Sequence, residues 1–320
     1  MKNRIFLAAS FFWMPFLLTD IMQPHQASSK NEYSLTIKPE YANDLDQEWI
    51  RSSHGNNVHV YKMKSDGSEV GHSVWIKRKE ERANAKYFAF KEQNDQKVAT
   101  VYDRFRAWKV DKDIVLVCSG AFSTELPGTN NRNAITVGLT VDNGRIVNRN
   151  IEYSMDGLVI VYATGGIVVS DIENKNLKIG NINISVIDDK TKLLDWAVKN
   201  KATIFQTQLL AYQNTLRISR AGRKEARERR FLVLAQSPSE GLYHIVFNLP
   251  QNNYLFDAAR DIFYFLKERK KMEVVAILNL DTGAYNVMEL YKDNEQQDLN
   301  IRGDTDVKVS TNLIVYHYSK

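Results

Sequence analysis

The sequence predicts one α/β domain, with a mixed sheet and a βαβ unit near the C-terminus. Strand-like and helix-like patterns are interspersed along the chain, and no linker rich in Pro, Gly or Ser separates them. Hydrophobic residues make up 43% of the 320 residues, enough for one large core or two modest ones. The clearest pattern lies between residues 242 and 286, where a strand, a helix and a second strand follow one another.

The βαβ unit is predicted from three consecutive segments. Residues 242–249 have a strand pattern, and residues 254–271 carry apolar side chains at the three-to-four spacing of one helix face. Residues 274–278 form a continuous apolar block, which suits a parallel strand covered on both faces. Ligands of such sheets gather beyond the carboxyl ends of the strands, so we expect Asp281 at a ligand-facing turn that Gly283 permits.

The N-terminus has the layout of a secretory signal peptide at residues 1–27. Two basic residues precede an apolar block at residues 5–18, which is shorter than the roughly 20 residues of a membrane span. We therefore expect a secreted or periplasmic protein, with an N-terminal arm at residues 28–54 and one domain at residues 55–320. The alternative is an uncleaved signal sequence, which would be the chain's only association with a membrane.

The other elements follow from alternation, helical spacing and turn residues. An alternating strand at residues 58–64 ends at a Ser-Asp-Gly turn and pairs with residues 73–77 in a hairpin. The remaining predicted elements are an exposed helix or irregular strand at 80–97, strands at 113–122, 134–141 and 203–212, a hairpin turn at 142–144 leading into 145–147, a hairpin of 158–162 with 167–170, and a helix at 191–199.

The glycine pair Gly165–Gly166 allows two interpretations. Between two strand patterns it is expected to form the turn of a hairpin. A glycine pair also lets the backbone approach a phosphate closely, but that use normally has a helix directly after it, and no helix pattern follows here.

A basic stretch runs from residue 216 to residue 230. Guanidinium groups present paired donors that match phosphate, so one of its arginines is a candidate for holding a phosphodiester. We expect most of its cations to form a solvated loop. The stretch contains no aromatic residue to stack on bases, and the net charge of +5 is mild, so nucleic acid is not expected as a partner.

Four short motifs stand in the order and spacing of a known family. They are residues 119–123, 205–210, 229–234 and 279–283. Over roughly residues 55–290 the sequence resembles the phosphodiester glycosidases related to the uncovering enzyme, which removes N-acetylglucosamine from a phosphodiester on mannose. Every motif departs from the family's pattern: for example, Thr282 stands in place of a glycine and Ser119 in place of an amide side chain.

The resemblance implies a hydrolase that acts on a sugar-phosphate diester or a related glycan, and no cofactor is expected. It implies Asp281 as the acid/base group or substrate anchor and Arg230 as the phosphate-binding residue, with Arg229 as the alternative register. Gln206 and Gln208 are implied to orient sugar hydroxyls. The other site residues that it implies are Ser119, Gly120, Asn279, Thr282 and Gly283.

A second function stays open beside the first. Hydrolysis needs an acid or base placed against the scissile oxygen, and Asp281 is the candidate at a strand end. An Asp before a Thr-Gly turn, however, often only accepts hydrogen bonds from its own loop. The alternative is therefore a catalytically inactive relative that binds an extracellular or envelope glycan or a partner protein.

Other chemistries find less support in the sequence. Residues 281–283 also match the Asp-Thr-Gly triplet of aspartic proteases, but a single-chain protease needs two such triplets and only one occurs. The six histidines show no paired spacing for a metal, and the acidic pair Asp304 and Asp306 is a weak calcium signal. Cys118 is the only cysteine, so it forms no intramolecular disulfide and is expected to be buried.

Overall fold

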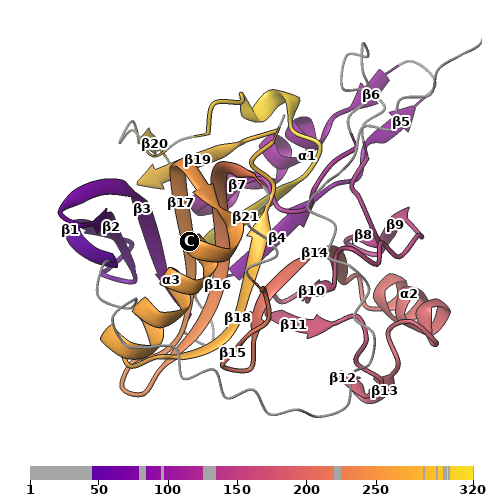
Figure 1. The fold of residues 1–320 in the computed structure, drawn as a ribbon. Helices are drawn as coiled ribbons and strands as arrows, with labels where there is room; N and C mark the ends of the chain where they lie inside the picture. The colour runs from indigo at the N-terminus through magenta and orange to yellow at the C-terminus, as the bar shows by residue number, and fades with distance from the viewer. Residues whose placement is uncertain are drawn as a thin grey trace, which may run out of the picture.

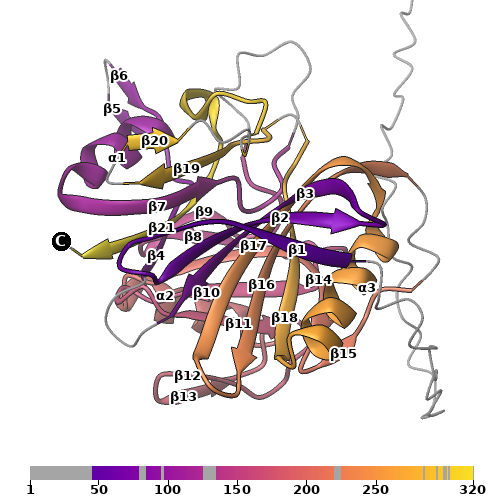
Figure 2. The same ribbon diagram turned by 90° about the vertical axis from the view of Figure 1, so that its left-hand side faces the viewer.

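The computed structural model describes residues 45–78, 84–94, 97–124, 135–219, 225–283, 285–292, 295–297, 301 and 303–319. A 12-stranded sheet and a 5-stranded sheet pack against each other through a shared apolar core, and all their described strand pairs are antiparallel (Figures 1 and 2). We call the face of the large sheet that meets the small sheet its inner face, and the opposite face its outer face.

The large sheet runs from edge strand β1 to edge strand β11. In spatial order its strands are β1 (Leu45–Ser53), β2 (Val58–Ser65), β3 (Ser68–Lys77), β17 (Gly241–Tyr254), β16 (Ala226–Ser237), β18 (Glu273–Leu280), β14 (Thr203–Tyr212), β10 (Gly157–Val161) and β11 (Ile167–Asp171). Outside this path, β15 (Thr215–Leu216) and β8 (Thr140–Asp142) pair with β14, and β9 (Arg145–Asn148) pairs with β8.

The small sheet pairs the last strand of the chain with two strands from its first half. Its strands are β20 (Glu295–Gln297), β19 (Met288–Lys292), β7 (Lys112–Cys118), β21 (Leu313–Ser319) and β4 (Asn84–Phe88). Two ribbons complete the strands: β5 (Glu92–Asn94) with β6 (Lys97–Ala99), and β12 (Leu177–Ile179) with β13 (Ile182–Ile184). The turn after β7 and the turn after β18 thus come from different sheets.

Three α-helices occur among the described residues, and each covers a different apolar cluster. Helix α3 (Leu255–Tyr264) lies on the outer face of the large sheet, where its apolar side chains join those of β16, β17 and β18 (Figure 2). Helix α2 (Lys190–Lys199) packs near β8, β9 and the β12–β13 ribbon (Figure 1). Helix α1 (Val101–Trp108) packs against the small sheet.

The α/β class predicted from the sequence is wrong, because the described sheets are antiparallel and strands greatly outnumber helices. The predicted strand, helix and strand exist as β17, α3 and β18, and β17 and β18 do run parallel. The antiparallel strand β16 lies between them and pairs with both. The apolar block in β18 misled the prediction because both faces of this antiparallel strand are covered, one by the small sheet and one by α3.

Several local predictions are confirmed. The hairpins β2–β3, β8–β9 and β10–β11, the helix α2 and the strands β7 and β14 occur where they were expected. In the β8–β9 turn, Asn143 and Gly144 have φ values of 51° and 78°, the positive values that the Asn-Gly pair predicted.

The predicted strand at residues 134–141 is mostly wrong. The described strand β8 begins only at Thr140, because the preceding backbone groups bond elsewhere. The amide of Leu139 donates to the Gln206 side chain at 2.6 Å, and the amide of Val137 donates to Phe122 O at 2.7 Å. Helix α1 was not predicted, although Thr100 and Asp103 form a complete capping box at its start.

The N-terminal predictions are only partly covered by the structure. The predicted signal peptide at residues 1–27 lies outside the described residues. Within the predicted arm, residues 45–53 form β1, which pairs with β2 along its whole length. No helix in the described part of the chain has both the length and the apolar character of a membrane span.

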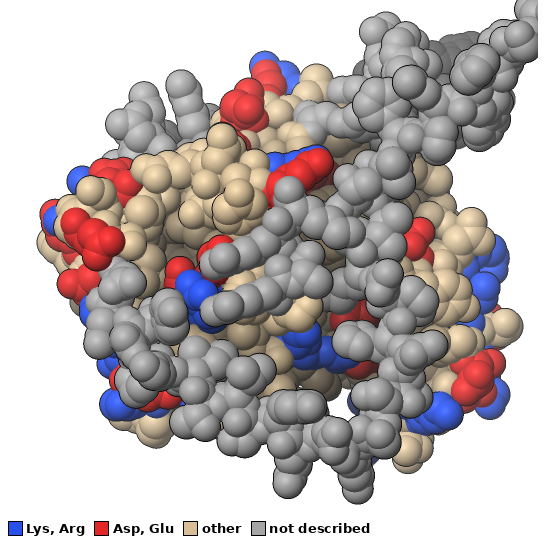
Figure 3. Space-filling model, in the orientation of Figure 1, with Lys and Arg blue, Asp and Glu red and all other residues tan. Residues whose placement is uncertain are grey.

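Charged side chains of both signs are interspersed on the face shown in Figure 3. Of the basic stretch at residues 216–230, Arg217 is held by Asp156 and Asp171, and Arg227 pairs with Glu225. Arg220, Arg223 and Lys224 lie outside the described residues.

Candidate functional site

Three segments that are distant in the sequence meet at one end of the two sheets. The main-chain N–H of Asp281 donates to Gly120 O at 3.2 Å, which joins the turn after β18 to the turn after β7. Val287 O accepts from the Ser119 N–H at 3.0 Å and from Arg230 Nη1 at 2.9 Å. The segment 281–287 is therefore bonded to both of the other motifs.

Arg230 is a fully buried cation in a cage of neutral oxygen atoms. Its Nε and Nη2 donate to Asn248 Oδ1 at 3.1 and 2.9 Å, and Nη2 also donates to Asn286 Oδ1 at 2.6 Å. Burial lowers the pKa of Arg230, and the carboxylates of Asp281 and Glu228 oppose that shift. The guanidinium thus stabilises the site through hydrogen bonds to amide and carbonyl oxygens and through longer-range attraction to carboxylates.

Asp281 is only 4% exposed and is held within its own turn. Its Oδ1 accepts the main-chain N–H of Gly283 at 2.8 Å, a local bond that an Asp two residues earlier in a turn commonly makes. Thr282 Oγ1 donates to Glu228 O at 2.9 Å, which fastens the turn to β16. The carboxylate also lies near enough to the buried phenol of Tyr87 to raise the pKa of Tyr87, although burial is the larger cause of that shift.

The turn at Ser119 and Gly120 is built for close packing. The Ser119 hydroxyl donates to Tyr285 O and accepts from the Val287 N–H at 3.2 Å, so it bridges two points of the Asp281 segment. A Cβ on Gly120 would lie 2.9 Å from Tyr87 Cε2, so a larger residue would require Tyr87 to move. The sequence placed both residues at the site, and the structure brings both against the Asp281 segment.

Gln208 and Asn279 face the other side of the large sheet. The two residues are paired across β14 and β18, and Asn279 Nδ2 donates to Gln208 Oε1 at 2.7 Å. Asn279 is also opposite Phe231, which packs on the outer face, whereas Arg230 is the next residue along β16 and therefore points to the inner face. The structure separates this amide pair from the Arg230 side chain by the sheet itself.

Gln206 is also buried and joins two loops. Its Oε1 accepts from the amides of Leu139 and Glu152 at 2.6 and 3.1 Å, and its Nε2 donates to the carbonyls of Glu152 and Met155 at 3.1 and 2.9 Å. These four bonds use both ends of the side-chain amide. The sugar-binding role implied for Gln206 stays a prediction.

Arg229 does not share the Arg230 cage. Its Nε donates to Asn253 O at 3.1 Å and its Nη2 donates to Glu225 O at 2.8 Å, which fastens the bulge where β16 meets the end of β17. As the neighbour of Arg230 on a strand, it points to the opposite face. Of the two registers that the sequence left open, Arg230 is the one that contacts the Asp281 segment.

Four polar residues of this region were not singled out from the sequence: Glu228, Asn248, Asn286 and Asn312. Asn286 bonds to Arg230 through its oxygen and to Glu228 Oε2 through its nitrogen at 2.7 Å. Asn312 Oδ1 accepts the amides of Gly120 and Ala121 at 3.0 and 2.9 Å. Three of the four are asparagines within or beside apolar strand patterns, a position too common to identify a site.

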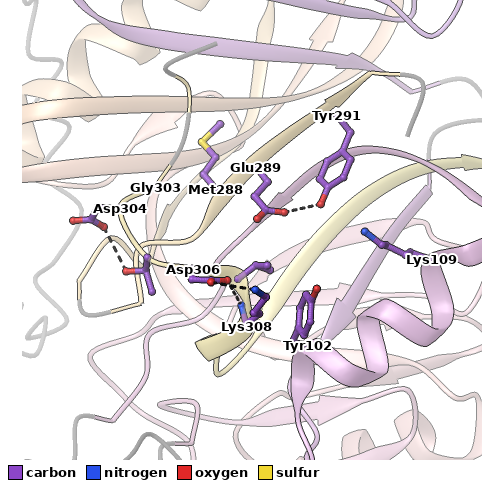
Figure 4. A pocket seen from close by; sticks show the side chains of 11 residues that line it. Tyr102, Lys109, Met288, Glu289, Tyr291, Gly303, Asp304, Asp306 and Lys308 are labelled. Atoms are coloured by element: carbon purple, nitrogen blue, oxygen red, sulfur yellow. Dashed lines mark hydrogen bonds and ion pairs between the residues drawn. The ribbon is translucent and has the colours of Figure 1, made fainter. Parts of the chain in front are cut away.

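A cavity of about 940 Å³ adjoins the same segment on the side of the small sheet (Figure 4). Tyr102 and Lys109 enter it from α1 and the turn after it, and Glu289 and Tyr291 from β19. Its other lining residues are Met288, Gly303, Asp304, Thr305, Asp306, Val307 and Lys308. Neither Asp281 nor Arg230 lines this cavity.

Cys118 and the acidic pair contribute no second reactive centre. Burial raises the pKa of Cys118 to about 12, so its thiol stays protonated at neutral pH. Asp304 and Asp306 both line the cavity of Figure 4, where Asp306 caps a short helical turn by accepting the Lys308 N–H at 2.9 Å. Within the described residues, no group of three or more His, Cys, Asp or Glu side chains is arranged to hold a metal ion.

Comparison with known proteins gives only distant structural similarity. The zebrafish N-acetylglucosamine-1-phosphodiester α-N-acetylglucosaminidase catalytic domain, auto-inhibited by its pro-peptide, aligns with 95% of this chain and 98% of its own at 13% identity and a TM-score of 0.47. A hypothetical protein from Synechocystis aligns with 86% of this chain and 62% of its own at 10% identity and a TM-score of 0.40. No family model and no curated protein sequence matches the chain.

Proposed function

We propose that this chain is a secreted hydrolase of the phosphodiester glycosidase type, acting on a sugar-phosphate diester or a related glycan. The observation that carries the proposal is the meeting of three sequence motifs: the turn at Ser119 and Gly120, the buried Arg230 and the Asp281 turn are joined by direct hydrogen bonds. Nothing in the local sequence requires these segments to touch, so their convergence supports a shared role.

Asp281 is the proposed acid/base group or substrate anchor. A carboxyl group at a strand end beside a buried guanidinium has the chemistry to exchange a proton with a scissile oxygen. Arg230 is the positive charge of the site. Because four hydrogen bonds already hold its guanidinium, direct contact with a phosphate requires the Asn286 side chain or the Val287 carbonyl to move aside.

Two observations favour a second candidate function, in which the chain binds a glycan or partner protein without cleaving it. The arginine and serine of the motifs are fully buried, and the large described cavity has neither Asp281 nor Arg230 in its lining. The lining of the cavity instead includes Tyr102 and Tyr291. Sugar rings or apolar side chains can pack on their aromatic rings. A ligand in this cavity would not touch the proposed catalytic carboxylate.

One experiment separates the two functions. Purified protein is incubated with a panel of glycosyl phosphodiesters, and release of the sugar is measured beside binding of the same compounds. Asp281→Asn is compared with Asp66→Asn, which removes a carboxylate from the exposed β2–β3 turn, where an Asn suits the positive φ of 49°.

The hydrolase proposal requires turnover by the natural sequence, loss of about 100-fold or more in Asp281→Asn, and unchanged turnover in Asp66→Asn. Binding without turnover, unaffected by Asp281→Asn, would replace it with the binding function. Neither turnover nor binding across the panel would contradict both.

A further inference from the structure

A second polar cluster lies between the two sheets, at the end of the inner face that is remote from Asp281. On the neighbouring strands β16 and β17, Arg230 pairs with Asn248, while His244 lies four residues earlier on β17. At roughly 3.3 Å per residue, this places His244 about 13 Å along the strand from the Arg230 cage. The cluster is therefore separate from the candidate site.

Arg78 supplies the charge of this cluster. It directly follows β3, and its amide donates to Leu242 O at 2.8 Å, so it continues the pairing of β3 with β17. Ile76, two residues earlier, packs on the inner face and is paired with His244. Strand alternation therefore places Arg78 and His244 on the same face as diagonal neighbours.

Within the described part of the chain, the guanidinium of Arg78 makes one hydrogen bond, from Nη1 to Gly165 O at 2.7 Å. No carboxylate among the described residues forms an ion pair with it. Burial lowers the pKa of Arg78, and the one charge interaction that opposes this comes from the phenol of Tyr316, which is itself uncharged at neutral pH because burial raises its pKa. A half-buried guanidinium normally has an anionic partner, since the cost of removing a cation from water is otherwise uncompensated.

His244 gives the second, independent observation. Its side chain is 1% exposed, and its Nδ1 lies 3.1 Å from the Tyr316 hydroxyl. Its Nε2 has no hydrogen-bond partner among the described residues. When the Tyr316 hydroxyl donates to Nδ1, the ring proton is on Nε2, and a buried N–H donor without an acceptor costs about 1–3 kcal/mol.

The Gly165–Gly166 turn completes the cluster from the β10–β11 hairpin. Gly165 has a φ of 86°, and a Cβ there would lie 2.6 Å from Asn84 Cβ, so the turn fits tightly against the start of β4. The Cβ position of Gly166 lies 3.5 Å from Tyr162 Cδ2 and 3.6 Å from Arg78 Nη2, which are ordinary van der Waals distances, so this turn lies directly beside the guanidinium.

We propose that Arg78, His244 and the Gly165–Gly166 turn form a binding site for a small oxyanion, a phosphate or carboxylate group. The planar guanidinium donates paired hydrogen bonds to two oxygens of such a group, and His244 Nε2–H donates to it from the neighbouring strand. The anion provides the countercharge that no described carboxylate supplies to Arg78. The glycine turn holds the guanidinium in place through the Gly165 carbonyl, without the helix that a phosphate-binding loop normally has.

The proposal is tested by titrating the full chain with inorganic phosphate, methyl phosphate and acetate in a calorimeter, with thermal unfolding as a second measurement. The two phosphates and acetate distinguish a phosphate site from a general carboxylate site. Arg78→Gln is expected to weaken binding of the preferred anion by about tenfold or more. Lys77→Gln is the matched control, because it removes the same charge from the adjacent residue, which forms an ion pair with Glu240 in the turn between β16 and β17.

The side-chain nitrogen resonances of His244 give a readout that depends on contact. Binding of the anion is expected to shift the Nε2 signal in the natural sequence and in Lys77→Gln, but not in Arg78→Gln. Equal weakening by the two substitutions would show that only overall charge matters and would overturn the proposal. So would the absence of binding of all three anions at millimolar concentration, or binding without a change at His244.

Discussion

The main-chain N–H of Asp281 donates to the carbonyl oxygen of Gly120 over 3.2 Å, and this bond helps to join the large sheet to the small sheet at the candidate site. The Asp281 turn leaves β18, and the Gly120 turn leaves β7. Val287 adds to this connection, because its carbonyl accepts hydrogen bonds from the Ser119 N–H and from Arg230 Nη1. Substitutions in this network should therefore affect the site and the packing of the two sheets together.

Replacing Arg230 should destabilise the fold. Arg230→Met leaves two buried oxygens, on Asn248 and Asn286, without their donor and removes one of the two donors to Val287 O, and the expected loss in the free energy of unfolding is about 3 kcal/mol or more. Urea denaturation measures this loss. Arg227→Met is the control, because Arg227 is largely exposed and its pair with Glu225 should contribute at most about 1 kcal/mol. Equal losses for the two variants would show that the cage does not stabilise the protein.

Gly303 should tolerate no side chain. A Cβ at this position would lie 1.9 Å from Asn286 O and 2.6 Å from Asn286 C, so the backbone that carries the Arg230 acceptors must shift. We expect Gly303→Ala to lower the free energy of unfolding by about 3 kcal/mol, against about 1 kcal/mol of backbone strain for Gly67→Ala in the open β2–β3 turn.

Thermal and urea unfolding of both glycine variants test this difference. If hydrolysis is detected, Gly303→Ala should also reduce it, because the shifted backbone leads directly to the Asp281 turn. A Gly303→Ala protein as stable as Gly67→Ala would contradict the close approach of residues 286 and 303.

Gln206 should contribute more to stability than Gln208. Gln206→Met removes the partner of two amides and two carbonyls, with an expected loss of about 3 kcal/mol, whereas Gln208→Met leaves only the Asn279 side-chain amide without its acceptor, at about 1 kcal/mol. Hydrogen exchange at the amides of Leu139 and Glu152 should accelerate only in Gln206→Met. A raised KM with unchanged exchange and stability would instead support the sugar-binding role implied for Gln206.

Acid should destabilise the protein through its buried histidines. Burial is the main cause that lowers the pKa of His317 to about 4 and of His244 to about 3, whereas an unperturbed histidine titrates near 6.5. As the pH falls below 6.5, the unfolded chain therefore binds protons that the folded chain does not. Stability should be retained above pH 6.5 and decline toward pH 4, by up to about 1.4 kcal/mol per pH unit for each histidine.

Urea denaturation at several pH values between 7 and 4 checks this decline. His317→Phe keeps an aromatic ring against Trp108, whose ring centroid lies 4.7 Å away, and removes one titrating group. The pH dependence of its stability should be shallower by about one proton. An unchanged slope would show that His317 does not resist protonation in the folded chain.

Local elements were predictable where the signal lies within a few residues. The turn between β8 and β9 requires positive φ values, and Asn and Gly are the residues that adopt such values most readily. Two of the four motifs, 119–123 and 279–283, lie where β7 and β18 end, and the other two lie within β14 and β16. Segments whose backbone bonds to distant groups were not predictable: just before β8, the amide of Val137 donates to the Phe122 carbonyl and the amide of Leu139 donates to the Gln206 side chain.

By itself, the sequence indicated most strands of the large sheet, the helices α2 and α3 and the hairpin turns, and it singled out Asp281 and Arg230 as residues whose chemistry suits a phosphodiester. Only the tertiary structure decided that the sheets are antiparallel, that Arg230 and not Arg229 meets the Asp281 segment, and that Gln208 and Asn279 lie on the other side of the sheet. The physical reason is that strand direction and strand neighbours depend on pairing between distant segments. A strand that is covered on both faces is apolar throughout, whether its neighbours run parallel or antiparallel to it. The apolar residues of β18 therefore could not indicate the direction of its neighbours.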